Sequence, residues 1–419
     1  MEDKLVELSY ALDTFYFLMT GALVMWMAAG FAMLEAGLVR AKNTVEILTK
    51  NIVLFAVACT MFMLVGYNIM YPGDAAVNLY WPGFSFLLGG DNTAEAVLGS
   101  GGDTYYSNMS DFFFQVVFVA TAMSIVSGAV AERMKLWAFL LFAVVLTSFI
   151  YPLQGYWKWG GGFLNEMGFQ DFAGSGVVHL CGATAAFAGV LLLGARLGKY
   201  GKDGQITPIP GCNMPLATLG TFILWLGWFG FNGGSQLVIS NVENANAVAM
   251  VFVNTNAAAA GGVIVALITS QLMFGKADLS MTLNGALAGL VAITAEPLNP
   301  DPLLATIIGG VGGFLVVFAI ITLDKLKVDD PVGAISVHGV VGIWGLIAVC
   351  FSHPEATIGT QLIGVATIFG FVFVSSFLTW FLIKKVIGIR VSEEEEYEGV
   401  DYSECGMEAY PEFTEIGKT

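Results

Sequence analysis

Two histidines stand in matching sequence frames, and they are the side chains of this chain best suited to handling a proton. The stretch DFAGSGVVH runs from Asp171 to His179, and DPVGAISVH runs from Asp330 to His338. Asp, Gly, Val and His occupy positions 1, 4, 8 and 9 of both, in a chain with only 3 histidines among 419 residues. Because imidazole changes charge near neutral pH, the pair could hold or relay a proton.

Each of these residues also has a plainer interpretation. An ionisable group inside an apolar segment is costly and is therefore a functional candidate by default, but the histidines could simply bond to a neighbouring helix. For Asp171 the structural alternative is stronger, since an aspartate just before a helix can be its N-cap. A cap that also faces a cationic substrate is compatible with both interpretations.

Metal and thiol chemistry have little support in the sequence. Four of the 5 cysteines lie in or beside apolar segments, and Cys405 lies near the C-terminus. The chain contains no CxxC and no HExxH, which are common marks of redox and metal sites. We expect no disulfide, no metal and no cofactor.

The elements that position these residues are strongly apolar. The chain is 56% hydrophobic and 12% charged, which leaves too few charges to cover a soluble globule. Stretches of about 20 apolar residues, long enough to cross the hydrocarbon core, recur along it. We predict eleven spans, near 14–38, 48–72, 111–131, 136–155, 175–196, 211–234, 246–274, 279–296, 302–323, 332–352 and 360–387.

The basic residues test this count independently. Fifteen of the 17 Lys and Arg fall in alternate connections or at the C-terminal end, and only Lys4 and Lys158 fall on the other side. By the positive-inside rule, the N-terminus is then outside and the C-terminus cytoplasmic. The fold class predicted is an all-α, multi-pass protein of the cell (inner or plasma) membrane.

The repeated frame also predicts the internal symmetry. Its two copies begin the fifth and tenth spans, so the repeat unit is five helices, an odd number, and the halves are inverted in the membrane. We expect repeat one over about 10–197, repeat two over about 210–353, and an eleventh helix at 360–387 that braces the bundle. Inverted repeats place a substrate site near the midplane, where His179 and His338 would meet.

The C-terminal segment differs from the rest. We assign 1–389 to a transmembrane domain and 390–419 to an acidic cytoplasmic tail. The tail has ten acids against Arg390 and Lys418, a balance of −8 and half of the chain's −16. The plainest interpretation of such a charge run is a solvated, disordered tail.

Aromatic residues make up 13% of the chain and gather in three clusters, at 112–118, 157–162 and 225–235. Aromatic faces stabilise ammonium-type cations while excluding water. For any single aromatic, however, packing is the plainer interpretation.

Seven ordered motifs in this chain resemble those of the ammonium transporter (Amt/Mep/Rh) family, and the resemblance covers all eleven spans and part of the tail. The first motif is closer to the Amt branch than to the Rhesus branch. The motifs are FAMLEAGLVRAKN (31–43), GAVAERM (128–134), WGGG (159–162), DFAGSGVVH (171–179), GWFGFNGGS (227–235), FVNTN (252–256) and VDDP…VHG (328–339).

The resemblance implies a homotrimer with one pore in each subunit, and it assigns roles to residues that match the family's motifs. It implies an external cation site at Phe118, Trp159 and Ser235 with the family's buried aspartate at Asp171, a phenyl gate at Phe118 and Phe231 with Trp228 below it, and the twin pore histidines at His179 and His338.

Three positions depart from the family's pattern. Gly333 stands where many bacterial members have an acid, and Asn284 stands where some have serine near the pore lining. In the family, a segment like 399–411 packs on the cytoplasmic face and regulates the pore, and a PII-type regulator can bind there. Cys405 replaces the usual histidine of that segment.

We therefore predict transmembrane transport of ammonium and ammonia for nitrogen uptake, and no enzymatic activity. Moving a bare cation into a medium of low dielectric costs on the order of tens of kcal/mol, so a narrow apolar pore rejects K⁺ and Na⁺. Ammonium can instead lose a proton at the gate and pass as a neutral amine along the histidine pair. Two alternatives remain: an ammonium sensor, or transceptor, with little transport, and a membrane enzyme that uses the histidines.

Overall fold

The chain forms a bundle of long helices in a computed structural model that describes residues 2–413. Within those residues every named element is a helix. Nine helical segments are long and apolar enough to cross a membrane, and two shorter apolar helices accompany them. This confirms the predicted all-α membrane fold.

The long elements follow the predicted spans closely, and several are continued by a π-helical turn. In chain order they are α1 (Glu2–Leu38), α2 (Thr44–Met61) with η2 (Phe62–Gly66) and α3 (Tyr67–Met70), α5 (Asn108–Ala129), α6 (Leu136–Val145) with η4 (Leu146–Ile150) and α7 (Tyr151–Lys158), η5 (Ser175–Leu180) with α9 (Cys181–Leu193), α10 (Met214–Gly234), α11 (Val242–Phe274), α12 (Leu279–Thr294), α13 (Pro302–Lys325), η6 (Ile335–Val340) with α14 (Val341–Ala348), and α15 (Ile358–Val386).

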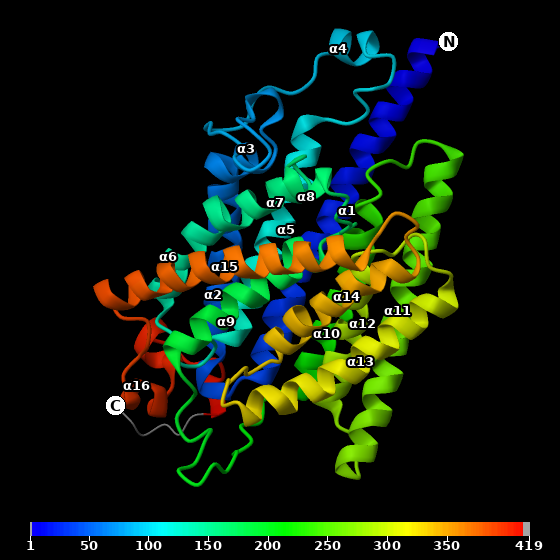
Figure 1. The fold of residues 1–419 in the computed structure, drawn as a ribbon. Helices are drawn as coiled ribbons and strands as arrows, with labels where there is room; N and C mark the ends of the chain where they lie inside the picture. Colours follow the sequence, from blue (N-terminus) through cyan, green and yellow to red (C-terminus); the bar gives the residue numbers. More distant parts are fainter. Residues whose placement is uncertain (1, 414–419) are drawn as a thin grey trace.

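Short helices lie in the connections and in the C-terminal segment. They are η1 (Ala41–Asn43), η3 (Gly73–Ala75), α4 (Ala94–Gly99), α8 (Phe163–Glu166), η7 (Val349–Phe351), α16 (Glu393–Glu398), η8 (Asp401–Cys405) and η9 (Pro411–Phe413). Figure 1 places α4 and the N-terminus at one end of the bundle and α16 at the other. We call these the α4 end and the α16 end.

The first helix begins at Glu2, well before the predicted start at residue 14. The reason is a tertiary contact of Asp13, which is fully buried. Its carboxylate accepts hydrogen bonds from the backbone N–H of Ile239 and from the N–H and hydroxyl of Ser240, at 2.7–3.0 Å. This pairing with the loop after α10 lets a charged residue continue the helix beyond its apolar part.

Glycines let the central helices approach closely. A Cβ on Gly37 of α1 would lie 2.5 Å from the backbone nitrogen of Ala217 in α10, and one on Gly309 of α13 would lie 2.0 Å from the carbonyl oxygen of Ala258 in α11. Small residues at such crossings allow backbone contact in lipid, where dispersion replaces the hydrophobic drive between helices. The glycine content seen in the sequence thus serves helix packing.

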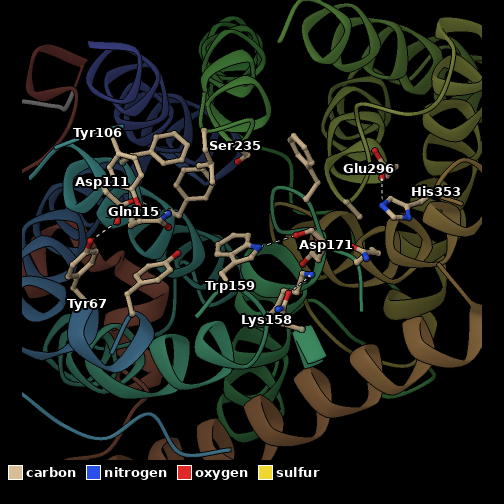
Figure 2. Close-up of a pocket in the computed structure, with 18 residues that line it drawn as sticks. Tyr67, Tyr106, Asp111, Gln115, Lys158, Trp159, Asp171, Ser235, Glu296 and His353 are labelled. Atoms are coloured by element: carbon tan, nitrogen blue, oxygen red, sulfur yellow. Dashed lines mark hydrogen bonds and ion pairs between the residues drawn. The ribbon is translucent and has the colours of Figure 1, made fainter. Parts of the chain in front are cut away.

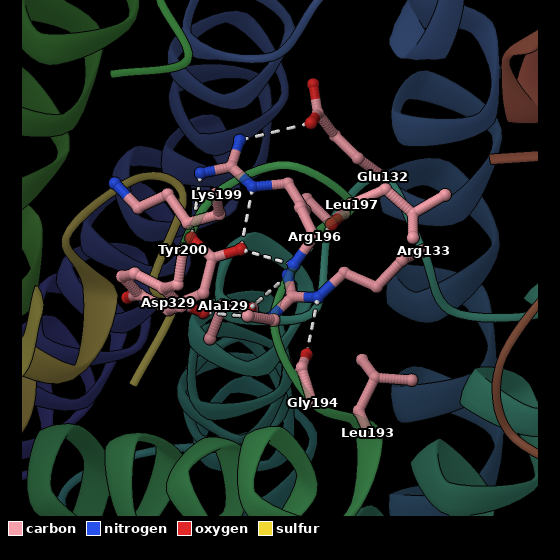
Figure 3. Close-up of polar contacts among 12 residues, drawn as sticks. Ala129, Glu132, Arg133, Leu193, Gly194, Arg196, Leu197, Lys199, Tyr200 and Asp329 are labelled. Carbon is pink, nitrogen blue, oxygen red and sulfur yellow. Dashed lines mark hydrogen bonds and ion pairs between the residues drawn. The ribbon is translucent and has the colours of Figure 1, made fainter. Parts of the chain in front are cut away.

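At the α16 end, a buried ionic network joins four connections of the bundle (Figure 3). Arg196 forms ion pairs with Asp329 at 2.9 Å and with Glu132 at 3.0 Å, and Arg40 also pairs with Glu132 at 2.9 Å. Arg133 donates to the carbonyl oxygen of Asp329 at 2.8 Å. Burial by itself raises the pKa values of both acids, but the guanidinium groups hold them below their ordinary values.

The C-terminal segment lies against this end, so the interpretation of a free, solvated tail is wrong for the residues from 390 to 405. Glu396 accepts from the N–H of Leu197 at 2.7 Å and pairs with Arg390 at 2.6 Å. Asp401 accepts from the N–H of Glu46 at the start of α2, at 2.8 Å. The end of the predicted tail, 414–419, lies outside the described residues.

Candidate functional site

A cavity of about 520 Å³ opens at the α4 end and is lined by aromatic, amide and carboxyl side chains (Figure 2). Four of the predicted site residues line it: Phe118, Trp159, Asp171 and Ser235. Trp159 and Ser235 are half-buried, while Phe118 and Asp171 are buried. The structure therefore brings the predicted external site together from α5, α7, α10 and the loop before η5.

Hydrogen bonds orient the polar parts of this cavity. The indole N–H of Trp159 donates to the carbonyl oxygen of Asp171 at 3.0 Å, which fixes the ring. The hydroxyl of Ser235 donates to the carbonyl of Phe231 one turn earlier, at 2.8 Å. Because that hydroxyl spends its proton on the helix, its oxygen remains free to accept a hydrogen bond from a cation.

Asp171 itself is held by the backbone. Its Oδ1 accepts from the N–H of Gly174 at 3.2 Å, and its Oδ2 accepts from those of Gly176 and Val177 at 2.9 and 2.8 Å. Burial raises the pKa of this carboxyl to about 6, although these three N–H groups favour the charged form. The carboxylate thus caps the entry to η5, and it reaches the cavity mainly through its effect on the loop.

The second frame repeats this construction at the opposite entry. Asp330 accepts from the N–H groups of Ala334 and Ile335 at 3.0 and 2.7 Å, and burial raises its pKa to about 6. The glycine at position 4 of each frame, Gly174 or Gly333, has a positive φ of 111° or 82° that favours glycine. Each frame then enters a π-helical turn that carries its histidine, a geometry common at functional sites.

A phenyl pair closes the cavity on its inner side. The ring centroids of Phe118 and Phe231 are 4.1 Å apart with planes tilted by 32°, and both side chains are buried. Trp159 stands edge-on to Phe118 with 6.1 Å between centroids. A solute in the cavity therefore meets two apolar rings before it can go further.

Below the phenyl pair stand the two histidines. The His179 ring is 5.3 Å from Phe231, 5.0 Å from Trp228 and 5.0 Å from His338, measured between centroids. The two Nδ1 atoms are 3.2 Å apart. Trp228 is fixed by donating from its indole N–H to the hydroxyl of Thr294, at 2.8 Å.

This contact gives the histidine pair a direction. One Nδ1 must carry a proton and the other must accept it, so one Nε2 is left bare and the other protonated. The Nε2 of His179 has no partner among the described residues. Two neutral imidazoles thus offer one acceptor and one donor to a small molecule that can both give and take hydrogen bonds, as ammonia can.

The line of rings ends at a second, small cavity toward the α16 end. The Phe31 ring lies 6.1 Å from that of His338, and both line an enclosed space of about 10 Å³. Asn284 and Gly333, the two departures noted near the pore, also line it. Phe118, Phe231, His179, His338 and Phe31 therefore form one row between the two cavities.

Sequence reasoning missed two carboxyl groups beside this row. Asp111 lines the outer cavity, where it accepts from the Tyr67 hydroxyl at 2.5 Å and from the Gln115 amide at 3.5 Å. It could have been found, because residues 111, 115 and 118 share one face of a helix. Glu35 of α1 lines the inner cavity, and its place there depends on packing between distant helices.

Metal chemistry finds no foothold in the described part of the chain. Residues 2–413 contain no group of three or more His, Cys, Asp or Glu side chains able to hold a metal ion. All five cysteines are free thiols. The polar groups of the site are suited to hydrogen bonding and cation binding instead.

Comparison with known proteins places this arrangement in a family. A family model described as "Ammonium Transporter Family" matches residues 15–410. Ammonium transporter Amt2 of Archaeoglobus fulgidus is 42% identical, covering 96% of this chain and 88% of its own. Ammonium transporter Amt1 of Haloferax mediterranei is 37% identical over 95% and 79% of the two chains.

Solved structures agree with the sequence comparison. A structure titled "Sensor Amt Protein" has a TM-score of 0.85 and 34% identity, covering 95% of this chain and 99% of the other. Mep2 of Candida albicans has a TM-score of 0.80 and 25% identity, covering 93% and 88%. With the family model matching nearly the whole chain, this multi-pass membrane protein belongs to the ammonium transporter family.

Proposed function

We propose that this protein transports ammonium across the cell membrane through a pore in each subunit, entering at the outer cavity and leaving past the histidine pair. The observation that carries the proposal is the row of rings between the two cavities, in which neighbouring centroids are 4.1–6.1 Å apart. The relatives named as ammonium transporters support the substrate.

Recruitment of the cation belongs to the outer cavity. Trp159 and Phe118 present aromatic faces, and contact with a cation there is worth roughly 0.5–2 kcal/mol. Ser235 adds one hydrogen-bond acceptor, and Asp171 supports the loop that carries this geometry. These interactions concentrate ammonium at the gate but are too weak to strip an ion of its water.

Selectivity then arises at the phenyl gate. Passage between Phe118 and Phe231 requires dehydration, and a bare monovalent cation in an apolar passage costs on the order of tens of kcal/mol. Ammonium can leave a proton behind and continue as a small neutral amine, whereas K⁺ and Na⁺ have no neutral form. The histidine pair then hydrogen-bonds the amine, so it is not left unsolvated in the passage.

Current measurements on purified protein in liposomes test this function. On a solid-supported membrane, an ammonium jump should give a transient current, or ammonium uptake without current if the proton does not follow, and a K⁺ jump should give neither. A K⁺ current comparable with the ammonium current would make the pore an ordinary cation channel. Phe118→Ala with Phe231→Ala would remove both gate rings and serves as the matched leak control.

A sensor role is the second candidate, and one comparison favours it. The protein of the solved structure with a TM-score of 0.85 is titled a sensor. A sensor would bind ammonium in the outer cavity but move little of it. Saturable binding with ammonium uptake no faster than that of empty liposomes would favour this role over transport.

The remaining parts of the proposal concern assembly and orientation. We infer a homotrimer in the bilayer, two inverted repeats over about 10–197 and 210–353, an eleventh helix at 360–387, and a transmembrane domain over 1–389. The α4 end faces outward and the α16 end, with the tail 390–419, faces the cytoplasm. A PII-type regulator is the proposed partner at that face, and native mass spectrometry tests both assemblies.

A further inference from the structure

The inner cavity contains a carboxyl group that the transport path has not yet used. Glu35 lies in the middle of the bundle and is only 1% exposed. Its Oε2 accepts from the Ser127 hydroxyl at 2.7 Å and from the Asn51 amide at 3.3 Å. Its Oε1 has no hydrogen-bond partner among the described residues. A buried carboxyl oxygen without a partner is costly.

No basic side chain of the described chain neutralises Glu35 through an ion pair. Lys50, one helix away, pairs instead with Glu46 at 3.4 Å, and both of those side chains are 1% exposed. The remaining buried ion pairs at this end belong to the network around Arg196. Glu35 is therefore an acid whose positive partner is not supplied by the protein.

A second oxygen faces the same space. The amide nitrogen of Asn284 donates to the carbonyl of Ser280 at 3.1 Å, which leaves Oδ1 as the free end of the amide. That Oδ1 would lie 2.8 Å from a Cβ on Gly333, where φ is +82°. Any side chain at 333 would meet this amide, so glycine there keeps the oxygen at the cavity wall.

The size of the space restricts its occupant. Its volume of about 10 Å³ is close to the roughly 10–15 Å³ that one water-sized molecule needs. Ammonium has that size and four N–H donors. Glu35, Asn284 and the His338 ring line the same cavity, so a carboxylate, an amide oxygen and an imidazole surround a single molecule.

We propose that Glu35 and Asn284 form an inner ammonium-binding site, on the far side of the histidine pair from the outer cavity. The inference rests on the proposed transport function and names a second stop for the same substrate. The carboxylate supplies the charge and the amide oxygen a further acceptor, and the cavity admits one ammonium ion. Asn51 and Ser127 are positioning residues that hold the other carboxylate oxygen.

Binding is tested by infrared difference spectroscopy on the purified wild-type protein, exchanging sodium buffer for ammonium buffer. Ammonium should shift the carboxyl bands of Glu35, identified as those missing in Glu35→Gln. Glu46→Gln, which removes the buried acid paired with Lys50, should leave the shift in place. Bands that do not respond to ammonium would mean that the cavity holds only water, and the site would be wrong.

Transport separates this site from the function as a whole. Glu35→Gln should lower the maximal ammonium flux by about tenfold and leave the half-saturating outer concentration within twofold, because the outer cavity is untouched. Glu35→Gln flux within twofold of wild type would overturn the inference. If wild type itself moves no ammonium, the transport proposal fails, while the infrared response still decides whether the site exists.

A second variant covers the case in which Glu35→Gln does not fold. Asn284→Ala removes the amide oxygen and leaves the carboxyl group in place. It should raise, by about tenfold, the ammonium concentration that gives half of the infrared change. An unchanged concentration would exclude Asn284 and, with it, the two-oxygen site.

Discussion

At the scale of single residues, the site combines neutral acceptors and apolar rings along the path with charges set to its sides. His179 and His338 are 159 residues apart in the chain, yet their Nδ1 atoms are 3.2 Å apart. Asp171 spends both carboxylate oxygens on backbone N–H groups. The transport proposal therefore assigns proton handling to the histidines and positioning to the aspartate.

The first prediction concerns ion selectivity. Replacing both histidines with aspartate, His179→Asp with His338→Asp, offers charge compensation where the wild type offers neutral relays. K⁺ should then carry current through the double variant and none through wild type, measured on the same liposome preparation. A double variant that is folded, passes ammonium and still rejects K⁺ would contradict selection by deprotonation.

The second prediction separates charge from capping at Asp171. Asp171→Ala leaves three buried N–H groups unpaired, each costing about 1–3 kcal/mol, and should abolish ammonium uptake. Asp171→Asn keeps one acceptor oxygen and should retain measurable uptake if capping dominates.

The matched control for this experiment is Asp330→Asn, which weakens the equivalent cap away from the outer cavity. If the charge of Asp171 also attracts the cation, Asp171→Asn should raise the half-saturating outer concentration, whereas Asp330→Asn should not. An Asn variant with wild-type uptake and affinity would remove the electrostatic role.

At the scale of elements, matched π-helical entries position the histidines, and buried ion pairs hold the connections of the α16 end. Arg196 joins the loop after α9 to those after α5 and α13 through Glu132 and Asp329. The tail reaches the same loops through Glu396. The α16 end is therefore one continuous polar layer over the inner cavity.

The third prediction measures this layer. Asp329→Asn leaves Arg196 without its buried partner and should cost about 3–5 kcal/mol of stability, seen as a marked fall in the melting temperature in detergent. Asp324→Asn is the matched control, because its pair with Lys199 is partly exposed (10% and 27%). Such a pair is worth about 0–1 kcal/mol. Equal losses in the two variants would contradict a structural role for the buried network.

The network also predicts the effect of pH. The folded-state pKa values of Asp329 and Glu132 lie below their ordinary values. Their contribution to stability is therefore fully present above the unfolded pKa of about 4 and is lost as pH falls further. The melting temperature of wild type should drop in that range more steeply than that of Asp329→Asn.

At the scale of the whole molecule, the alternation of basic residues predicts an orientation for the bundle. A cysteine-free background with Asp3→Cys or Asp203→Cys tests it, because both positions are exposed at opposite ends of the chain's path through the membrane. A membrane-impermeant maleimide should label residue 3 on intact cells, and residue 203 only after permeabilisation. The reverse pattern would invert the proposed direction of transport.

Much of this molecule is encoded in local sequence pattern. Apolar length predicted the eleven spans, because each must match the thickness of the bilayer core, and the structure confirms the all-α membrane fold. The motifs from Phe31 to Gly339 predicted membership of the ammonium transporter family, which the comparisons confirm. The shared Asp and Gly positions pointed to two equivalent helix entries, since a cap and a positive φ are local requirements.

Only the tertiary structure decided which residues meet. Glu35 reaches the inner cavity, Asp13 continues α1 past its apolar part, and the tail from 390 to 405 lies against the α16 end. None of these follows from hydropathy, because each depends on a partner more than a hundred residues away. In an apolar bundle, helix packing determines which polar groups find partners, and so leaves Glu35 with one unpaired oxygen.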